Sequence, residues 1–190
     1  MARDKAQLRG SMRQRRAALF RETPDAAARA AAHLPPDRLA GARVVAGYRP
    51  QGGEMDPLPL MRRFAAAGAS LALPVATGPQ ARLTFRVWSE GDPLAPDVFG
   101  IPSPMAAQPE VRPDIIIAPV LAFDRHGGRL GQGAGCFDRT LVWARNGEAV
   151  FAIGLAFAGQ EVELVPIAPH DQGLDAILTE TGYIEIRKDL

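Results

Sequence analysis

The chain has 190 residues, of which 47% are hydrophobic, and its formal net charge is +1 at pH 7. This size and apolar content predict a globular unit with a hydrophobic core and exclude a disordered chain. The near-neutral charge gives the chain as a whole no strong attraction to nucleic acids or membranes. Its single cysteine excludes an internal disulfide and a zinc site built from several cysteines.

Neither a membrane span nor a secretory signal is expected. No run approaches the roughly 20 apolar residues of a span, and the amino terminus has no apolar core. The stretch before Glu22 is rich in arginine and poor in acidic residues, which superficially resembles a mitochondrial presequence. The lone cysteine fits a reducing compartment. We expect a cytoplasmic protein without a membrane or nucleic-acid partner, and we expect it to be a monomer.

The first 20 residues predict a helix with Leu8, Met12 and Leu19 close to one face. Basic residues recur along it at steps of four, four and three and form a stripe: Lys5, Arg9, Arg13 and Arg16. Such a stripe is most simply a solvated surface. Two functional interpretations stay open, because its cations could reach a phosphate site or the helix could be a nucleic-acid-binding arm.

A second, alanine-rich helix is predicted from Thr23 to about His33. Thr23 is a candidate N-cap, and the proline that follows it fits the first helical turn. The helix is expected to end there because two consecutive prolines follow.

A strand–helix–strand unit is predicted over residues 43–75. The first strand, residues 43–48, leads into a loop with two adjacent glycines that ends on Glu54. A helix over residues 56–67 and a strand over residues 70–75 follow. This order implies a parallel pair of strands joined by a right-handed crossover.

Residues 78–113 are less regular. A strand-like alternation covers residues 83–88, after which prolines and glycines punctuate a long loop. Trp88 and Phe99 could line a pocket for an aromatic ligand, or could simply anchor the core and the loop.

The clearest strand of the second half is residues 114–120, which are apolar on both faces like a central parallel strand. A glycine-rich loop and a helix over residues 136–145 follow it. Further strands are expected over residues 150–156, 176–179 and 183–186, with a short one over residues 162–166.

These elements together predict an α/β fold, a three-layer sandwich with a mostly parallel, Rossmann-like central sheet. We expect the helices of residues 1–34 to form an arm that packs on an α/β core of residues 42–187. Residues 1–190 would then form one domain.

The most informative segment is RLGQGAGCFDR, residues 129–139. Its alternate glycines let backbone N–H groups approach a phosphate, and the following helix amino terminus adds partial positive charge. The spacing is neither that of a P-loop nor that of the dinucleotide fingerprint. Asp138 could cap the helix or bind Mg²⁺, and Asp171 is a second candidate for the metal.

Other site chemistries have less support. The histidines lie in separate segments without metal-ligand spacing. Cys136, at the start of the predicted helix, could act as a nucleophile, but no histidine lies in a recognisable partner motif.

In their order along the chain, the motifs resemble those of the 5-formyltetrahydrofolate cyclo-ligase family over nearly the whole length. The glycine-loop signature is specific by itself, and the full set of motifs supports the resemblance more strongly than any one of them. The matching motifs are KAQLR at 5–9, YRPQGGE at 48–54 with Asp56, LP at 73–74, FGI at 99–101, PDIIIAP at 113–119, AFD at 122–124, GRLG through DR at 128–139, and Pro166 with His170-Asp171.

The resemblance implies an ATP- and Mg²⁺-dependent conversion of 5-formyltetrahydrofolate to 5,10-methenyltetrahydrofolate, with ADP and phosphate as products. Transfer of the γ-phosphoryl group to the N-formyl oxygen creates a phosphate leaving group. N10 then attacks the formyl carbon, and phosphate departs as the ring closes. Such a site needs charge neutralisation and alignment more than a strong base.

By the same resemblance, the residues expected to bind ATP are Lys5, Arg9, Arg129, Leu130, Gly131, Gln132, Gly133, Ala134, Gly135, Cys136 and Phe137. Those expected to contact the folate are Arg49, Glu54, Gln132, Gly133, Ala134, Gly135 and Cys136, with Glu54 accepting hydrogen bonds from pterin N–H groups. Asp138 and Asp171 match the Mg²⁺ ligands, and Arg129 and Asp138 are the expected catalytic residues.

The chain departs from the family pattern at the end of the loop. The family has Gly-Tyr-Tyr-Asp-Arg there, whereas this chain has Cys136 and Phe137 in place of the two tyrosines. One lost hydroxyl corresponds to about 0.5–1.5 kcal/mol, and to more if its hydrogen bond forms only in the transition state. An alternative therefore stays open, namely a diverged member with another substrate or with mainly a folate- and ATP-binding role.

Overall fold

The computed structural model describes residues 2–147 and 149–186. Met1, the expected start of the first helix, and residue 187, the expected end of the core, lie outside the described residues. The helices are α1 (Ala2–Glu22), α2 (Ala26–His33), α3 (Leu58–Ala66) and α4 (Cys136–Arg145), with short 3₁₀ turns η1 (Pro36–Arg38) and η2 (Ala158–Gln160).

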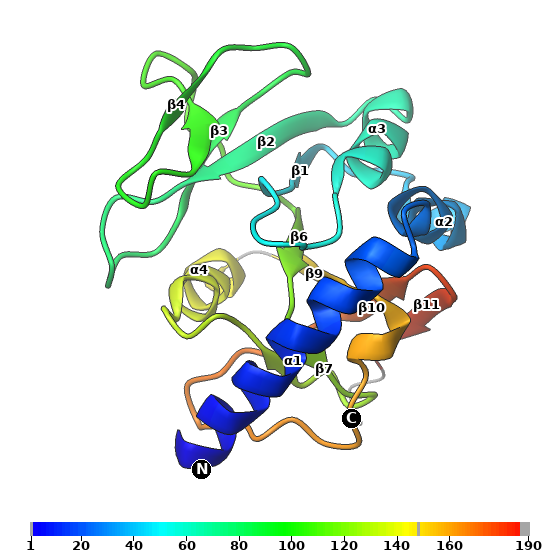
Figure 1. The fold of residues 1–190 in the computed structure, drawn as a ribbon. Coiled ribbons are helices and arrows are strands. Elements are labelled where there is room, and N and C mark those ends of the chain that lie inside the picture. The colour runs from blue at the N-terminus through cyan, green and yellow to red at the C-terminus, as the bar shows by residue number, and fades with distance from the viewer. Residues whose placement is uncertain (1, 148, 187–190) are drawn as a thin grey trace.

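A seven-stranded sheet forms the centre of the molecule (Figure 1). Its strands are β1 (Val44–Ala46), β2 (Ser70–Val75), β3 (Thr84–Val87), β6 (Ile115–Pro119), β9 (Phe151–Leu155), β10 (Ala176–Thr179) and β11 (Gly182–Glu185). They lie in the order β11-β10-β9-β6-β1-β2-β3. The inner strands pair in parallel and the two edge strands, β3 and β11, pair antiparallel. The predicted mostly parallel sheet is confirmed.

Side chains of β6 alternate between the two faces of this sheet, as strand geometry requires. Ile115 and Ile117 pack into a core shared with α2 and α3, and Leu19 of α1 lies against the same core. Ile116 and Ala118 pack on the opposite face, in a core shared with α4. Figure 1 shows α1 running across the molecule, with α2 and α3 beyond its carboxyl-terminal end. The predicted three-layer α/β sandwich is confirmed.

Strands β1 and β6 are neighbours in the sheet, and the chain continues from them toward opposite edges of the sheet, from β1 to β2 and from β6 to β9. The crossover from β1 to β2 contains α3, whereas the crossover from β6 to β9 contains α4 on the other face. In such sheets, the diverging connections leave a crevice at the carboxyl ends of the two strands. The sheet therefore places a potential binding site where the loops after β1 and β6 begin.

Two small antiparallel ladders lie outside the main sheet: β4 (Leu94–Pro96) with β5 (Pro102–Pro104), and β7 (Ala122–Phe123) with β8 (Arg129–Leu130). The second one turns the chain between β6 and the glycine loop. The carboxylate of Asp124 organises this turn by accepting hydrogen bonds from the N–H groups of His126 and Gly128, both at 2.9 Å.

Two local predictions are wrong. Residues 162–166 form no strand in the described structure, because the Val165 N–H donates instead to the buried carboxylate of Asp124 at 2.8 Å. Thr23 is not the N-cap of α2; its hydroxyl donates back to the Leu19 carbonyl of α1 at 2.6 Å, and Asp25 occupies the cap position.

Candidate functional site

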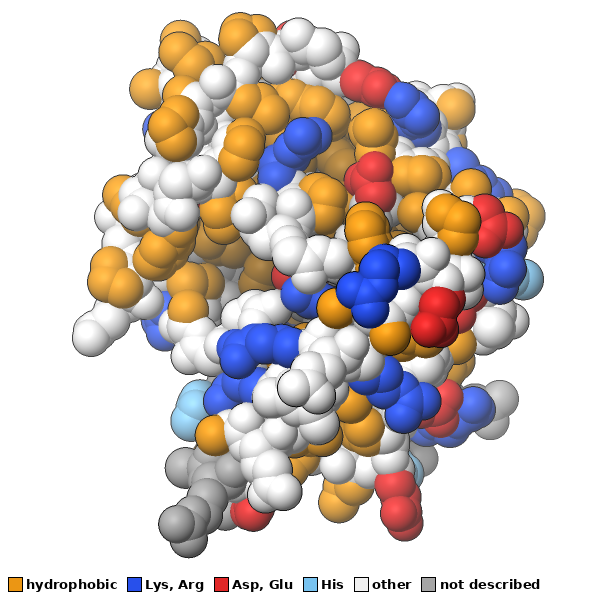
Figure 2. Space-filling model, viewed as in Figure 1, with side chains coloured by type: hydrophobic (Ala, Val, Ile, Leu, Met, Phe, Trp, Pro, Cys, Tyr) orange, Lys and Arg blue, Asp and Glu red, His pale blue; other side chains and the backbone are white. Residues whose placement is uncertain are grey.

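A cleft of about 1260 Å³ opens at the carboxyl ends of β1, β2 and β6. Figure 2 shows a hollow bordered by hydrophobic side chains, with Lys and Arg side chains close by. Among the described residues, seven basic and four acidic side chains line the cleft, so it favours anionic ligands. Every residue that the sequence assigns to ATP, folate or metal lines it: Lys5, Arg9, Arg49, Glu54, Arg129, Leu130, Gly131, Gln132, Gly133, Ala134, Gly135, Cys136, Phe137, Asp138 and Asp171.

The glycines of the loop before α4 are packed directly against arginines. A Cβ atom at Gly133 would lie 3.4 Å from Cζ of Arg9, and one at Gly135 would lie 2.9 Å from Nη1 of Arg139. Both glycines also have positive φ angles, +112° and +67°, which favour glycine. The loop therefore needs glycine both for its backbone conformation and for the approach of two guanidinium groups.

The amino terminus of α4 opens onto this loop. Gly135 is its N-cap in a left-handed conformation, without a side-chain cap. Asp138 does not cap the helix, so that interpretation is wrong. Its Oδ1 accepts hydrogen bonds from Arg129 Nη2 at 2.6 Å and from the Gln172 N–H at 3.0 Å. The first-turn N–H groups of α4 thus have no side-chain cap within the described part of the chain, which is the arrangement that helix termini use to bind phosphate.

Arg129 lies at the base of the cleft and is only 7% exposed. Besides its contact with Asp138, its Nε donates to the Gln172 carbonyl at 3.1 Å. Burial lowers the pKa of Arg129, while the charges of Asp138 and Asp171 oppose that change. A guanidinium remains protonated under these conditions, so Arg129 is a fixed positive charge between two carboxylates.

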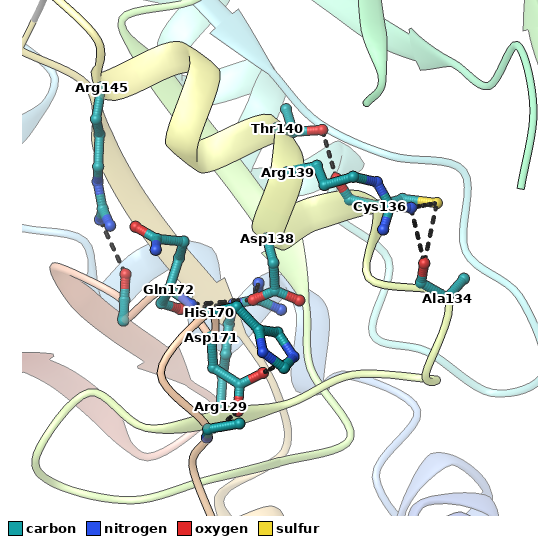
Figure 3. Close-up of polar contacts among 12 residues, drawn as sticks. Arg129, Ala134, Cys136, Asp138, Arg139, Thr140, Arg145, His170, Asp171 and Gln172 are labelled. Carbon is teal, nitrogen blue, oxygen red and sulfur yellow. Dashed lines mark hydrogen bonds and ion pairs between the residues drawn. The ribbon is translucent and has the colours of Figure 1, made fainter. Parts of the chain in front are cut away.

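Asp171 lies on the loop after η2 and contacts the first turns of α1. Its Oδ2 accepts hydrogen bonds from Lys5 Nζ and from the Ala168 N–H. Burial acts to raise the pKa of Asp171, but these hydrogen bonds outweigh it and the pKa is lower than usual. Figure 3 shows Asp138 projecting from α4 toward the segment that carries His170 and Asp171.

The residues present fit a divalent cation only in combination with a ligand. Among residues 2–147 and 149–186, no group of three or more His, Cys, Asp or Glu side chains is arranged to hold a metal ion. Magnesium, however, commonly uses one or two carboxylates and completes its shell with water and phosphate oxygens. Both hydrogen bonds to Asp138 use Oδ1, which leaves Oδ2 for a ligand. Asp138 and Asp171 match this requirement.

The basic stripe of α1 faces the cleft along its whole length. Lys5 contacts Asp171 as described, Arg9 Nε donates to the Gly131 carbonyl at 3.0 Å, and Arg13 Nε donates to Gln132 Oε1 at 3.1 Å. The simplest interpretation, a solvated surface stripe, is therefore wrong for this helix.

The last basic residue of the stripe, Arg16, contacts the loop after β1. Its Nη1 lies 3.3 Å from Glu54 Oε1, and the pair is almost fully buried. Tyr48 lies beside them and donates its hydroxyl proton to the Met55 carbonyl. Burial, together with the charge of Glu54, raises the pKa of Tyr48 well above its ordinary value, so this residue is a neutral donor.

The two aromatic candidates for a pocket separate in the structure. Phe99 lines the cleft and is 46% exposed, whereas Trp88 is 4% exposed in the core, so the pocket interpretation of Trp88 is wrong. Asp97 orders the loop that carries Phe99 by accepting the N–H groups of Phe99 and Ile101. Within the described residues, Arg49 lines the cleft without a hydrogen bond or an ion pair.

The two residues at the unusual end of the glycine loop have different surroundings. Cys136 is half-buried, and its sulfur lies 4.0 Å from the Ala134 carbonyl and 3.7 Å from Arg139 Nη2. Phe137 packs against the core under α4. The phenyl ring thus has a packing role that needs no hydroxyl group.

Some cleft residues were not assigned from the sequence. Arg139 donates to the Ala134 carbonyl at 2.8 Å and so braces the glycine loop. Asp97 and His170 also line the cleft. The spacing of the arginines on α1 signalled Arg13 and Arg16 as a group, but no local pattern distinguishes Asp97 from an ordinary loop aspartate.

Comparisons with known proteins agree with this architecture. Residues 1–180 match the model of the 5-formyltetrahydrofolate cyclo-ligase family. The chain is 32% identical to a 5-formyltetrahydrofolate cyclo-ligase from Mycolicibacterium smegmatis, over 97% of this chain and 98% of the relative. It is 33% identical to the 5-formyltetrahydrofolate cyclo-ligase of Escherichia coli strain K12, over 76% of this chain and 81% of the relative.

Solved structures of similar fold also include proteins named 5,10-methenyltetrahydrofolate synthetase. The chain is similar to the 5,10-methenyltetrahydrofolate synthetase of Aquifex aeolicus, with a TM-score of 0.81 and 26% identity over 98% of this chain and 94% of that one. The fold is also that of a 5,10-methenyltetrahydrofolate synthetase from Mycoplasma pneumoniae, with a TM-score of 0.71 and 20% identity over 93% of this chain and 99% of that one. No helix within the described residues has the length and apolar character needed to cross a membrane.

Proposed function

Because the chain belongs to the 5-formyltetrahydrofolate cyclo-ligase family, we propose that it converts 5-formyltetrahydrofolate to 5,10-methenyltetrahydrofolate with ATP and Mg²⁺, releasing ADP and phosphate. The observation that carries the proposal is that one cleft combines a glycine loop, a helix amino terminus, a row of cations and a carboxylate pair. A cytoplasmic monomer remains the expectation from the sequence.

The triphosphate would lie between α1 and the glycine loop. Lys5 and Arg9 enter the cleft from α1, and Arg129 lies at its base. Together with the N–H groups of Gly133 and Gly135, they supply donors for phosphate oxygens at the positive end of α4. This arrangement supports ATP as the co-substrate.

Asp138 and Asp171 would hold the magnesium ion that accompanies the triphosphate. When bound, this ion supplies charge neutralisation on the phosphate oxygens. Arg129 orients the Asp138 carboxylate through the 2.6 Å hydrogen bond to Oδ1. The protein's part is therefore to fix the carboxylates before the ligand arrives.

The folate would lie toward the loop after β1. Glu54 is a buried carboxylate there, suited to accept hydrogen bonds from pterin N–H groups, and Arg49 is a cation without a partner among the described residues. Phe99 offers an exposed aromatic face at the same cleft. These residues support a flat, polar heterocycle with an acidic tail as the second substrate.

The proposed reaction needs alignment more than proton transfer. The formyl oxygen attacks the γ-phosphorus, the bond to the ADP oxygen breaks, and the formyl carbon becomes electrophilic. N10 then attacks that carbon and loses its proton to water or to a phosphate oxygen. The carbon–oxygen bond breaks, and phosphate leaves with the former formyl oxygen. Arg129 and the loop N–H groups stabilise the negative charge that moves onto phosphate oxygens in both steps.

The test is formation of the methenyl chromophore from 5-formyltetrahydrofolate, ATP and Mg²⁺ by wild-type protein and Asp138→Asn. The wild type should form product with one ADP per methenyl group, and the variant should lose turnover while it remains folded. Asp37→Asn is the matched control, because Asp37 is exposed and does not line the cleft. No methenyl product from folded wild-type protein would overturn the proposal.

The replacement of two family tyrosines favours one alternative. A diverged member would bind ATP and 5-formyltetrahydrofolate but turn them over weakly, or would use another substrate. Tight binding of 5-formyltetrahydrofolate without methenyl formation would support it. Methenyl formation by the wild type at a rate equal to that of Cys136→Tyr would exclude it.

A further inference from the structure

Arg16, like Arg129, is a nearly fully buried cation of the cleft, with 4% of its surface exposed. Besides Glu54, it contacts two backbone carbonyls of the loop after β1. Its Nη2 donates to the Gln51 carbonyl at 3.4 Å and to the Gly52 carbonyl at 3.0 Å. One guanidinium group of α1 therefore holds both a side chain and the backbone of this loop.

The loop is shaped to meet this guanidinium group. Gly52 and Gly53 both have positive φ angles, +54° and +80°, which turn the chain tightly. The turn also brings the Gln51 N–H to within 2.9 Å of Glu54 Oε2. Each carboxylate oxygen of Glu54 thus accepts one hydrogen bond from the protein, and the side chain is held from two directions.

This pair is a costly way to stabilise a fold. Two charges are removed from water, and the Nε atom of Arg16 is buried without a hydrogen-bond partner among the described residues. Replacing a buried ion pair by apolar residues of similar volume is often neutral or stabilising. A purely structural contact between α1 and this loop would be served as well by apolar packing. The buried charge pair therefore indicates a functional role at the cleft in addition to a structural one.

We infer that Arg16 is the positioning residue for folate recognition, because it holds the Glu54 side chain and fixes the direction in which its carboxylate faces the cleft. The inference rests on the proposed function for the identity of the ligand. Arg16 itself acts through Glu54 and takes no part in phosphoryl transfer. The same helix then serves both ends of the cleft, with Lys5 and Arg9 at the phosphate end and Arg16 at the folate end.

Equilibrium binding of 5-formyltetrahydrofolate and of ATP, each measured separately by calorimetry, tests this role. Arg16→Gln should weaken folate binding about tenfold or more, as expected for a lost hydrogen bond to a charged group. Its ATP affinity should change by less than about threefold, which corresponds to under 1 kcal/mol. The reason is that Arg16 contacts Glu54 and the loop after β1, at the folate end of the cleft. In steady-state kinetics KM for the folate should rise more than kcat falls.

Two further variants control for local structure. Arg15→Gln removes a charge from the neighbouring position, which is exposed and does not line the cleft, and should leave both affinities unchanged. Arg16→Lys keeps the charge and should restore part of the folate affinity. A lysine cannot reach Glu54 and both carbonyls with one planar group, so the rescue should be incomplete. If Arg16→Gln does not fold, the loss of folate affinity is compared with the loss of ATP affinity in Arg16→Lys instead.

A double-mutant cycle with Glu54→Gln decides whether Arg16 acts through Glu54. The double variant should bind folate within about twofold of Glu54→Gln alone, because the carboxylate that Arg16 positions is already gone. If the losses of folate affinity in the two single variants multiplied in the double variant, the inference would be overturned. An equal loss of ATP and folate affinity in Arg16→Gln would also overturn it. Wild-type protein that binds folate without making methenyl product would remove the proposed function and leave this binding test intact.

Discussion

Lys5 and Asp171 contact each other in the cleft although 166 positions separate them in the chain. The contact joins the start of α1 to the loop that carries one proposed metal ligand. Each proposed metal ligand is in fact held by a cation, because Arg129 contacts Asp138 in the same way. A divalent ion arriving alone would compete with both cations, whereas one arriving with a triphosphate offers Lys5 and Arg129 new anionic partners.

Lys5→Met should therefore lower ATP affinity by about tenfold or more, the value of one charge-assisted hydrogen bond. The same change should strengthen the binding of Mn²⁺ alone, because the competing ammonium group is gone. Calorimetry with ATP and electron paramagnetic resonance with Mn²⁺ would measure the two effects without turnover.

Arg21→Met is the control for this pair of measurements, since Arg21 is an exposed cation at the far end of the same helix. It should change neither affinity. If Lys5→Met left ATP binding at the wild-type value, Lys5 would have no role in holding the triphosphate.

The contact also predicts a dependence of stability on pH. The pKa of Asp171 is lower in the folded protein than its ordinary value of 3.8, so folding favours the ionised form. The stabilisation is present above about pH 4 and is lost as the pH falls through the lowered folded-state pKa. Urea unfolding should show Asp171→Asn less stable than the wild type at pH 6, with a smaller difference at pH 3. A difference that grows toward acid pH would contradict this prediction.

Gly133 should tolerate no side chain. Alanine there must adopt a φ angle near +112° and would lie 3.4 Å from the Arg9 guanidinium carbon. We expect Gly133→Ala to cost about 1 kcal/mol or more in stability and to weaken ATP binding, because the loop and Arg9 both move.

Gly10→Ala is the matched control within α1. A methyl group at Gly10 meets no atom of the described residues within 4 Å, and alanine favours a helix interior over glycine by about 1 kcal/mol. Thermal unfolding should therefore show this variant stabilised with ATP affinity unchanged. Equal ATP affinities in Gly133→Ala and wild type would argue against a phosphate site at the loop.

Much of the fold could be predicted because its signals are local. Residues 114–120 are apolar on both faces, as expected of a central strand in a covered sheet, and β6 covers Ile115–Pro119 within this range. The short ladders β4–β5 and β7–β8 could not be predicted in the same way. Their strands have two or three residues each, too few to show a period.

The sequence could predict a set of residues that line one cleft, but it could not predict their geometry. Asp138 illustrates the limit, because an aspartate in the first turn of a helix looks locally like a cap. Its real partner is Arg129, which is nine residues earlier and is brought back by the turn of the glycine loop. The burial of Arg16 could not be predicted from the sequence either, because it depends on how α1 packs against the loop after β1.

Cys136 gives the last prediction. The cysteine sulfur faces Arg139 and the Ala134 carbonyl, at the point where the glycine loop meets α4. A tyrosine at this position would carry a hydroxyl group into the cleft that the present side chain lacks. Cys136→Tyr should therefore raise the methenyl-forming rate by up to about tenfold, the range of one neutral hydrogen bond, with ATP affinity unchanged. Cys136→Phe separates the ring from the hydroxyl and should leave the rate near that of the wild type. An equal gain in both variants would mean that packing of the ring, and not a hydrogen bond, limits turnover.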